Sequence, residues 1–126
     1  METREQANDG GYYAVIFTSR RTEGDNGYGK MAEEMERLAS AQPGFIGVDS
    51  VREESGAGIT ISYWESLEAI GDWKNNAAHR VAQERGRAEW YRGYEVKICK
   101  VEREYSLSEK TGAEDENAGF DAERER

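Results

Sequence analysis

The feature that most constrains the fold is the order in which strand-like and helix-like patterns follow one another along the chain. Residues 12–18 are aromatic or β-branched almost throughout, which is typical of a strand that is apolar on both faces. A charged, glycine-containing loop follows. The spacing of apolar residues in 28–41 then predicts an amphipathic helix, whose apolar stripe is formed by Tyr28, Met31, Met35 and Leu38.

The second half of the chain repeats this order. Residues 45–53 and 58–64 predict two strands joined by a short glycine-bearing turn, and the second strand alternates well. Ser66 is a typical N-cap, and a helical region interrupted by Asn75 and Asn76 follows it. We expect that region to run to about Arg85 and to stop at Gly86, before a long last strand at about 90–105. Val96 and Ile98 share one face of this strand, whereas Val101 lies on the other. This switch of faces predicts a bulge near Cys99 or Lys100.

The resulting order, β-α-β-β-α-β, predicts an α+β fold of the ferredoxin-like kind. Such a fold has a four-stranded antiparallel sheet with both helices on one face. In this chain the opposite face is also rich in apolar and aromatic residues, and two helices on one side cannot cover it. Because large exposed apolar patches usually mark interfaces or ligand grooves, we expect a homodimer formed through the sheet face.

Length and charge divide the chain into one domain and two polar ends. We expect a disordered lead-in at 1–11, a folded domain at 12–106, and an acidic, disordered tail at 107–126. The net charge is −9, and residues 106–126 carry seven acids and only three bases. The few basic residues of the domain are interleaved with acids and form no stripe, so the chain lacks the electrostatic footprint of a nucleic-acid-binding protein.

The remaining composition favours a cytoplasmic protein. The single cysteine, Cys99, cannot form an internal disulfide, which suits a reducing compartment. No apolar run approaches the roughly 18 residues of a membrane span. Residues 1–10 are polar and lack the apolar stretch of a signal peptide. One histidine and one unpaired cysteine also cannot build a usual zinc or iron site, so we expect no bound metal.

The most informative segment is residues 63–105. It contains the string Y-W-E-S-L-E-A-I-x-x-W-K-x-x-x-x-H-x-x-A-Q-x-x-G-R, which resembles a small bacterial branch of the antibiotic biosynthesis monooxygenase (ABM) family. Q-P-G-F-I-G at 42–47 matches the family's usual joint between helix and strand, and V-E-R-E-Y at 101–105 fits the same branch. The resemblance covers residues 12–106.

This resemblance implies a dimeric α+β barrel with a pocket between the sheet and the helices of each subunit. In the enzymes of the family, a quinone-like aromatic substrate is oxygenated there without metal or flavin. An electron-rich phenolate can itself pass an electron to oxygen, so the protein need only bind, orient and help to deprotonate it. On this basis His79 and Asn76 are the candidate catalytic residues. The candidate residues for binding a small aromatic substrate are Trp64, Trp73, Trp90, Tyr91 and Tyr94.

Each of these residues also has a structural interpretation. A lone histidine on a helix is more often an ordinary side chain than a catalyst, tryptophans are good core residues, and Asn76 readily interrupts a helix. The same fold can bind a ligand without reacting, in a sensing, carrier or stress-related role. The haem-degrading members of the superfamily have a histidine at the position of Gln83 and an asparagine in the first strand, where this chain has Thr18 or Ser19. Haem degradation is therefore less favoured.

Overall fold

The computed structural model describes residues 11–108. The predicted lead-in and the predicted acidic tail therefore lie outside the described residues, apart from Gly11 and residues 107 and 108. Eight elements follow one another along the chain. They are β1 (Tyr12–Arg21), α2 (Tyr28–Ser40), β2 (Phe45–Arg52), β3 (Ala57–Trp64), α3 (Leu67–Lys74), α4 (Ala77–Arg85), the π-helical turn η1 (Gly86–Trp90) and β4 (Tyr91–Val101).

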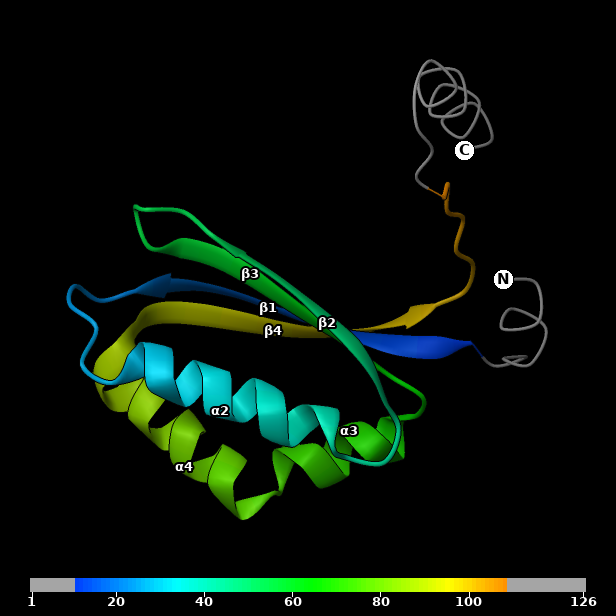
Figure 1. The fold of residues 1–126 in the computed structure, drawn as a ribbon, viewed down its shortest axis with the longest axis horizontal. Coiled ribbons are helices and arrows are strands. Elements are labelled where there is room, and N and C mark those ends of the chain that lie inside the picture. Colours follow the sequence, from blue (N-terminus) through cyan, green and yellow to red (C-terminus); the bar gives the residue numbers. More distant parts are fainter. Residues whose placement is uncertain (1–10, 109–126) are drawn as a thin grey trace.

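The four strands form one antiparallel sheet in the order β2-β3-β1-β4. All three α-helices lie on one face of this sheet, and the opposite face carries none of the elements of residues 11–108 (Figure 1). The predicted ferredoxin-like α+β fold is thus confirmed. The second helical region is split, as the asparagine pair indicated: α3 ends at Lys74, and α4 begins after Asn76.

The register of the strands decides which side chains face the helices. Val15 of β1 pairs with Ser62 of β3 on one side and with Ile98 of β4 on the other. Phe17 pairs in the same way with Thr60 and Val96. Because paired residues point to the same face of a sheet, these side chains form two rows across the helix-covered face. The alternate residues of each strand point to the open face.

The core lies at the end of the sheet where α3 begins. Trp64 is fully buried and packs with Ala39, Ala69 and Ile70, which come from α2 and α3. Its indole N–H donates to the Ser62 hydroxyl at 2.9 Å, so the buried polar atom is satisfied. Gly44, just before β2, lets the chain approach α3 closely, because a Cβ there would lie 2.6 Å from the Ala69 Cβ.

Two details of the last third of the chain differ from the sequence prediction. Gly86 does not stop the helix: it has helical dihedral angles (φ −59°, ψ −47°) and starts the π-helical turn. The last strand ends at Val101, and its register with β1 is regular at Cys99 and Lys100. The irregularity lies instead at the other end, between Arg20 and Arg21 of β1. The predicted bulge was wrong because β4 carries apolar residues on both of its faces. The switch of apolar residues from one face to the other therefore requires no irregularity in the backbone.

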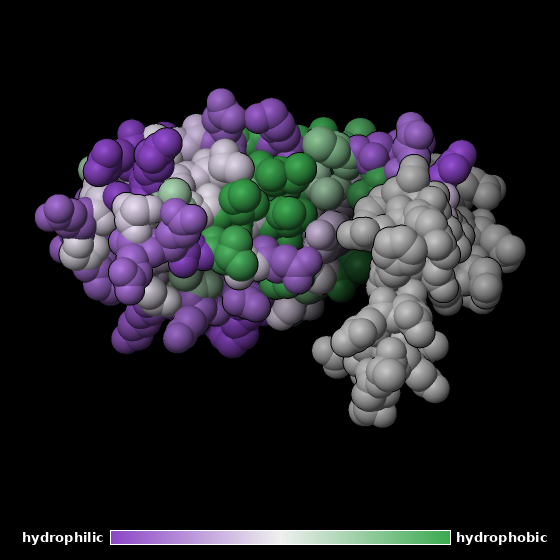
Figure 2. Space-filling view, turned by 90° about the horizontal axis from the view of Figure 1, so that it is seen from above, coloured by the Kyte–Doolittle hydropathy of each residue, from purple (hydrophilic) through white to green (hydrophobic). Residues whose placement is uncertain are grey.

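The open face of the sheet exposes an apolar surface (Figure 2). Its members alternate with the helix-facing residues and include Ile16, Val51, Ile59 and Ile61. Val51 is 70% exposed and Ile59 is 40% exposed, which is unusual for β-branched residues in a sheet. Among residues 11–108, no helix is long and apolar enough to cross a membrane.

Candidate functional site

A cavity of about 610 Å³ lies between the helices and the covered face of the sheet. Its size is typical of sites for small molecules, which measure roughly 300–1,000 Å³. Six of the seven residues singled out in the sequence line this cavity, namely Trp64, Trp73, His79, Trp90, Tyr91 and Tyr94. They come from β3, α3, α4, η1 and β4, so the topology brings together side chains that lie far apart in the sequence.

His79 is held against the end of α3 by two contacts with Trp73. The imidazole stacks on the indole with ring centroids 4.3 Å apart and an angle of 11° between the planes. Its Nδ1 lies 3.0 Å from the Trp73 carbonyl oxygen. A carbonyl oxygen can only accept a hydrogen bond, so Nδ1 carries the proton. In the neutral ring, Nε2 is then the atom with a lone pair.

Two opposing influences set the protonation of His79. Partial burial disfavours the imidazolium form and lowers the pKa of His79 below its ordinary value, while the hydrogen bond to the Trp73 carbonyl raises the pKa by a smaller amount. The net effect is a pKa of His79 below its ordinary value. At neutral pH the ring is therefore an uncharged base whose Nε2 is available to take a proton.

An aromatic stack continues from His79 into the core. Trp73 lies nearly parallel to Trp64, with ring centroids 6.3 Å apart and an angle of 24° between the planes. Phe45 meets Trp64 edge to face at 5.3 Å. We name these four side chains, Phe45, Trp64, Trp73 and His79, the histidine end of the cavity. Aromatic rings are wide, stiff walls that favour a planar ligand.

Asn76 does not line the cavity, which differs from its predicted place beside His79. It is the N-cap of α4, and its side-chain oxygen accepts from the backbone N–H groups of Ala78 at 2.9 Å and His79 at 3.2 Å. Asparagine is among the best N-cap residues because its short side chain reaches these amides. The structure thus favours the alternative interpretation, that Asn76 shapes the break between the two helices, and it still acts on His79 through the backbone.

A second aromatic cluster lines the other part of the cavity. Phe17 contacts Tyr91 and Tyr94 with ring centroids 5.2 and 5.3 Å apart. Tyr28 contacts Trp90 and Tyr91, both at 5.8 Å and nearly perpendicular. Burial is the main cause that raises the pKa of Tyr91, and its hydrogen bond with Tyr28 adds to this. The Tyr91 phenol therefore remains protonated at all ordinary pH values.

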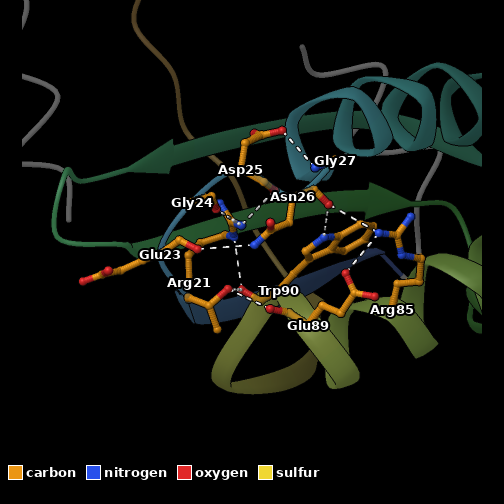
Figure 3. Close-up of polar contacts among 10 residues, drawn as sticks. Arg21, Glu23, Gly24, Asp25, Asn26, Gly27, Arg85, Glu89 and Trp90 are labelled. Carbon is orange, nitrogen blue, oxygen red and sulfur yellow. Dashed lines mark hydrogen bonds and ion pairs between the residues drawn. The ribbon is translucent and has the colours of Figure 1, made fainter.

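The loop between β1 and α2 holds Trp90 in place (Figure 3). The Trp90 indole N–H donates to the carbonyl oxygen of Asn26 at 3.0 Å. Arg85 donates to the same oxygen at 3.3 Å, and its guanidinium lies 4.7 Å from the centre of the indole ring. The Trp90 carbonyl oxygen in turn accepts from the Arg21 Nε at 3.1 Å. Trp90 is only 2% exposed, so this clasp fixes one wall of the cavity.

Sequence reasoning missed several residues that line the cavity. Tyr28, Met31 and Met35 were expected on the apolar stripe of a helix, and that stripe faces the cavity as well as the core. The other lining residues that were not singled out as binding residues include Val15, Phe17, Thr60, Ser62 and Gln83. The polar pair Thr60 and Ser62 carried a signal, because polar residues on the helix-facing side of a strand indicate a hollow. Within the described part of the chain, no three His, Cys, Asp or Glu side chains are grouped as metal ligands.

Comparison with known proteins agrees with this architecture. Uncharacterized protein YqjZ of Bacillus subtilis (strain 168) is 52% identical over 100 residues, which are 79% of this chain and 88% of that protein. SnoaB of Streptomyces nogalater, described as a cofactor-independent oxygenase, superposes with a TM-score of 0.65 at 14% identity, over 79% of this chain and 99% of SnoaB.

Rv0793 of Mycobacterium tuberculosis gives a TM-score of 0.66 at 14% identity, over 75% of this chain and 99% of that protein. At such low identities these two similarities show the fold alone. Residues 12–85, more than half of the chain, match the family described as antibiotic biosynthesis monooxygenase. Together with the high identity to YqjZ, this match shows that the chain belongs to the antibiotic biosynthesis monooxygenase family.

Proposed function

We propose that the protein is a cofactor-independent monooxygenase that oxidises a small aromatic, quinol-like substrate in the cavity between sheet and helices. The observation that carries this proposal is the state of His79. Its Nδ1 proton is directed to the Trp73 carbonyl, its ring is neutral at pH 7, and it lines an aromatic cavity. A general base in this state is what removal of a phenolic proton requires.

The aromatic walls supply the binding part of the function. The histidine end stacks Trp64, Trp73 and His79 in nearly parallel planes, and a planar ring can bind against such a wall. Holding the phenolic oxygen within hydrogen-bond reach of Nε2 makes the proton transfer effectively unimolecular. Partial burial of the imidazole also favours its basic form.

The proposed reaction uses molecular oxygen as the only oxidant. His79 Nε2 takes the proton of a phenol, and the phenolate passes one electron to O₂. The resulting phenoxyl radical and superoxide combine, which forms a C–O bond at the ring carbon para to the original hydroxyl. The peroxide takes a proton from the imidazolium, the para C–H proton leaves, and the O–O bond breaks. One oxygen atom remains as the second carbonyl of a para-quinone, and the other leaves as water, so phenol and O₂ give quinone and water.

The same proposal includes the setting in which the protein works. We propose a homodimer in which the open faces of two sheets pack together, because the exposed apolar side chains of that face are otherwise unfavourable in water. We also place the protein in the cytoplasm, where its one cysteine, Cys99, remains reduced. The structural similarity to SnoaB, an oxygenase that needs no cofactor, supports the choice of reaction.

The test is a screen of phenols and quinols for oxygen uptake, with ¹⁸O₂ to follow the oxygen atoms. We expect a product that is one ¹⁸O heavier, and a His79→Phe variant slower by about 10²–10⁴-fold, because phenylalanine keeps the ring stack but removes the base. Asn76→Ser, which retains the helix cap outside the cavity, serves as the matched control and should remain active.

Three results would count against the proposal. Equal rates for His79→Phe and the wild-type protein would remove His79 from the mechanism. Release of hydrogen peroxide without ¹⁸O in the product would indicate an oxidase. Binding without uptake for every phenol in the screen would leave a non-catalytic ligand-binding or stress-related protein as the better description.

A further inference from the structure

The cavity has a second end, far from His79. On β3, Trp64 belongs to the histidine end, whereas Gly58 lies six residues earlier, about 20 Å away at roughly 3.3 Å per residue. Gly58 pairs with Ser19 of β1 and Arg52 of β2. A Cβ at position 58 would lie 2.6 Å from the Arg52 guanidinium carbon. The missing side chain therefore leaves room for Arg52 to reach over β3 to Ser19 of β1.

Two arginines gather around Tyr28 at this second end. Arg52 donates from Nη1 to the Gly56 carbonyl at 2.6 Å, and from Nη2 to the Ser19 hydroxyl at 2.8 Å and to the Tyr28 hydroxyl at 3.4 Å. The Arg21 guanidinium carbon lies 3.8 Å from the centre of the Tyr28 ring. Among residues 11–108, none of the ion pairs involves either arginine. Both positive charges are thus held by neutral groups.

Two residues that line the cavity at this end, Tyr28 and Tyr91, share a hydrogen bond between their hydroxyl groups. Arg52 donates to the Tyr28 oxygen, which polarises the Tyr28 O–H group and makes it a stronger donor. Burial raises the pKa of the Tyr91 phenol, although Arg21 and Arg52 act in the opposite direction. One of these two O–H groups donates to the oxygen of the other, which leaves one O–H, backed by two cations, to donate to a ligand.

We propose that this arginine-backed tyrosine pair, Tyr28 and Tyr91 with Arg21 and Arg52 behind them, binds a carboxylate of the substrate. The substrate class is then an aromatic acid, with its carboxylate at the tyrosine pair and its oxidised ring at the histidine end. The inference rests on the proposed function and makes its substrate more specific. The remaining hydroxyl proton can donate to one carboxylate oxygen, the two arginines supply positive charge behind it, and the planar carboxylate continues the plane of an aromatic ring.

The charged residues that line the cavity are Glu36, Lys74 and Arg87. Glu36, which lines the cavity, lies eight residues after Tyr28 on α2, about 12 Å along the helix and toward the histidine end. Lys74 at the end of α3 offsets the charge of Glu36 at that end, whereas no acidic residue among the lining residues offsets the arginines behind the tyrosine pair. Arg87, the lining arginine of η1, belongs to the turn that precedes Tyr91 and adds positive charge on that side.

The experiment compares 2-naphthoate with naphthalene-2-carboxamide, which has the same shape without the charge. All three tryptophans of the chain line the cavity, so quenching of intrinsic fluorescence reports binding to the full-length protein. We expect the wild-type protein to bind the acid about tenfold more tightly than the amide. Tyr28→Phe and Tyr91→Phe, which keep the rings, should each weaken binding of the acid by about tenfold and binding of the amide less.

Arg52→Gln removes one of the two positive charges and should weaken binding of the acid more than binding of the amide. Tyr105→Phe, an exposed tyrosine that is not among the lining residues, is the matched control. If wild-type protein binds both ligands equally, or if the tyrosine variants keep the preference, the carboxylate assignment is wrong and the aromatic site remains. If neither ligand binds, the aromatic site is wrong and this inference fails with it.

Discussion

At the scale of single residues, one carbonyl group decides what His79 can do. The Trp73 carbonyl sits at the end of α3, where the last carbonyls of a helix lack partners within the helix, and it accepts from His79 Nδ1. The backbone N–H of Asn76 also donates to this carbonyl at 3.0 Å, and the contact with His79 selects the tautomer with a lone pair on Nε2. The ring stack on Trp73 then fixes the plane of the imidazole. A structural role and a chemical role therefore coincide in this pair.

The lowered pKa of His79 predicts a specific pH dependence of stability. Because the unfolded chain takes up this proton more readily than the folded chain, the free energy of unfolding rises with pH in this range. The stabilisation is complete above the unfolded pKa of about 6.5 and is lost as the pH falls through the lower folded value. Urea unfolding at pH 7.5 and pH 5 should show a smaller loss for His79→Phe than for the wild-type protein. An equal loss in both proteins would contradict this linkage.

At the scale of elements, the run from α3 to β4 shows how a broken helix builds a cavity. The cap at Asn76 restarts the chain as α4 in a new direction, and the π-helical turn then adds a residue before Tyr91. Single π turns are rare and occur frequently at functional sites. Here the turn carries Trp90, and the clasp with the β1–α2 loop holds the turn against the sheet.

The cap itself can be tested without any substrate. Asn76→Ala removes the acceptor for the backbone amides of Ala78 and His79, and should lower the free energy of unfolding by about 0.5–2 kcal/mol. Asn76→Ser keeps an acceptor of the right kind and should cost much less. Chemical denaturation of both variants measures the difference. Equal stabilities of the alanine and serine variants would show that the cap contributes nothing.

The outcomes at this scale also show what a sequence can predict. Strand and helix periods, the hairpin and the asparagine break follow from local patterns, so these elements were predicted close to their observed bounds. Gly86 was misread because glycine usually follows a helix, whereas here contacts from the distant β1–α2 loop extend the turn. The polar residues Thr60 and Ser62 were a sequence signal for a hollow, but which face of β3 the helices cover depends on tertiary packing, so the cavity was expected from the family resemblance. The role of Asn76 could likewise not be decided from the sequence, because an asparagine at a break between two helices suits both an N-cap and a catalytic residue.

At the scale of the whole molecule, the sheet is a thin layer with two different tasks. One face forms the roof of the cavity, and the other is an exposed apolar surface (Figure 2). The polar Thr60 and Ser62 face the helices, while Ile59 and Ile61 of the same strand face outward. This arrangement is the reverse of an ordinary half-buried strand. It supports the proposal that a second copy of the chain covers the outward side.

Dimerisation through this face predicts a mass of about twice the 14.2 kDa of one chain in sedimentation at micromolar concentration. Ile61→Glu places a charge in the middle of the proposed interface, and burial of an unpaired charge is strongly unfavourable, so this variant should be a monomer. Val81→Glu makes the same type of change on α4, where Val81 is 51% exposed, and should remain a dimer. A wild-type protein that sediments as a monomer would exclude the sheet interface.

The π-helical turn has a consequence for how a gene of this kind can change. Side chains of a strand alternate between its faces, so a shift of β4 by one residue exchanges the two sets. If one codon between Gly86 and Trp90 were lost and β4 were drawn back by one residue, Val96 and Ile98 would point outward, and Glu95 and Lys97 would enter the cavity. Substitutions in this turn keep the register of β4, whereas a change in the number of its residues can alter it.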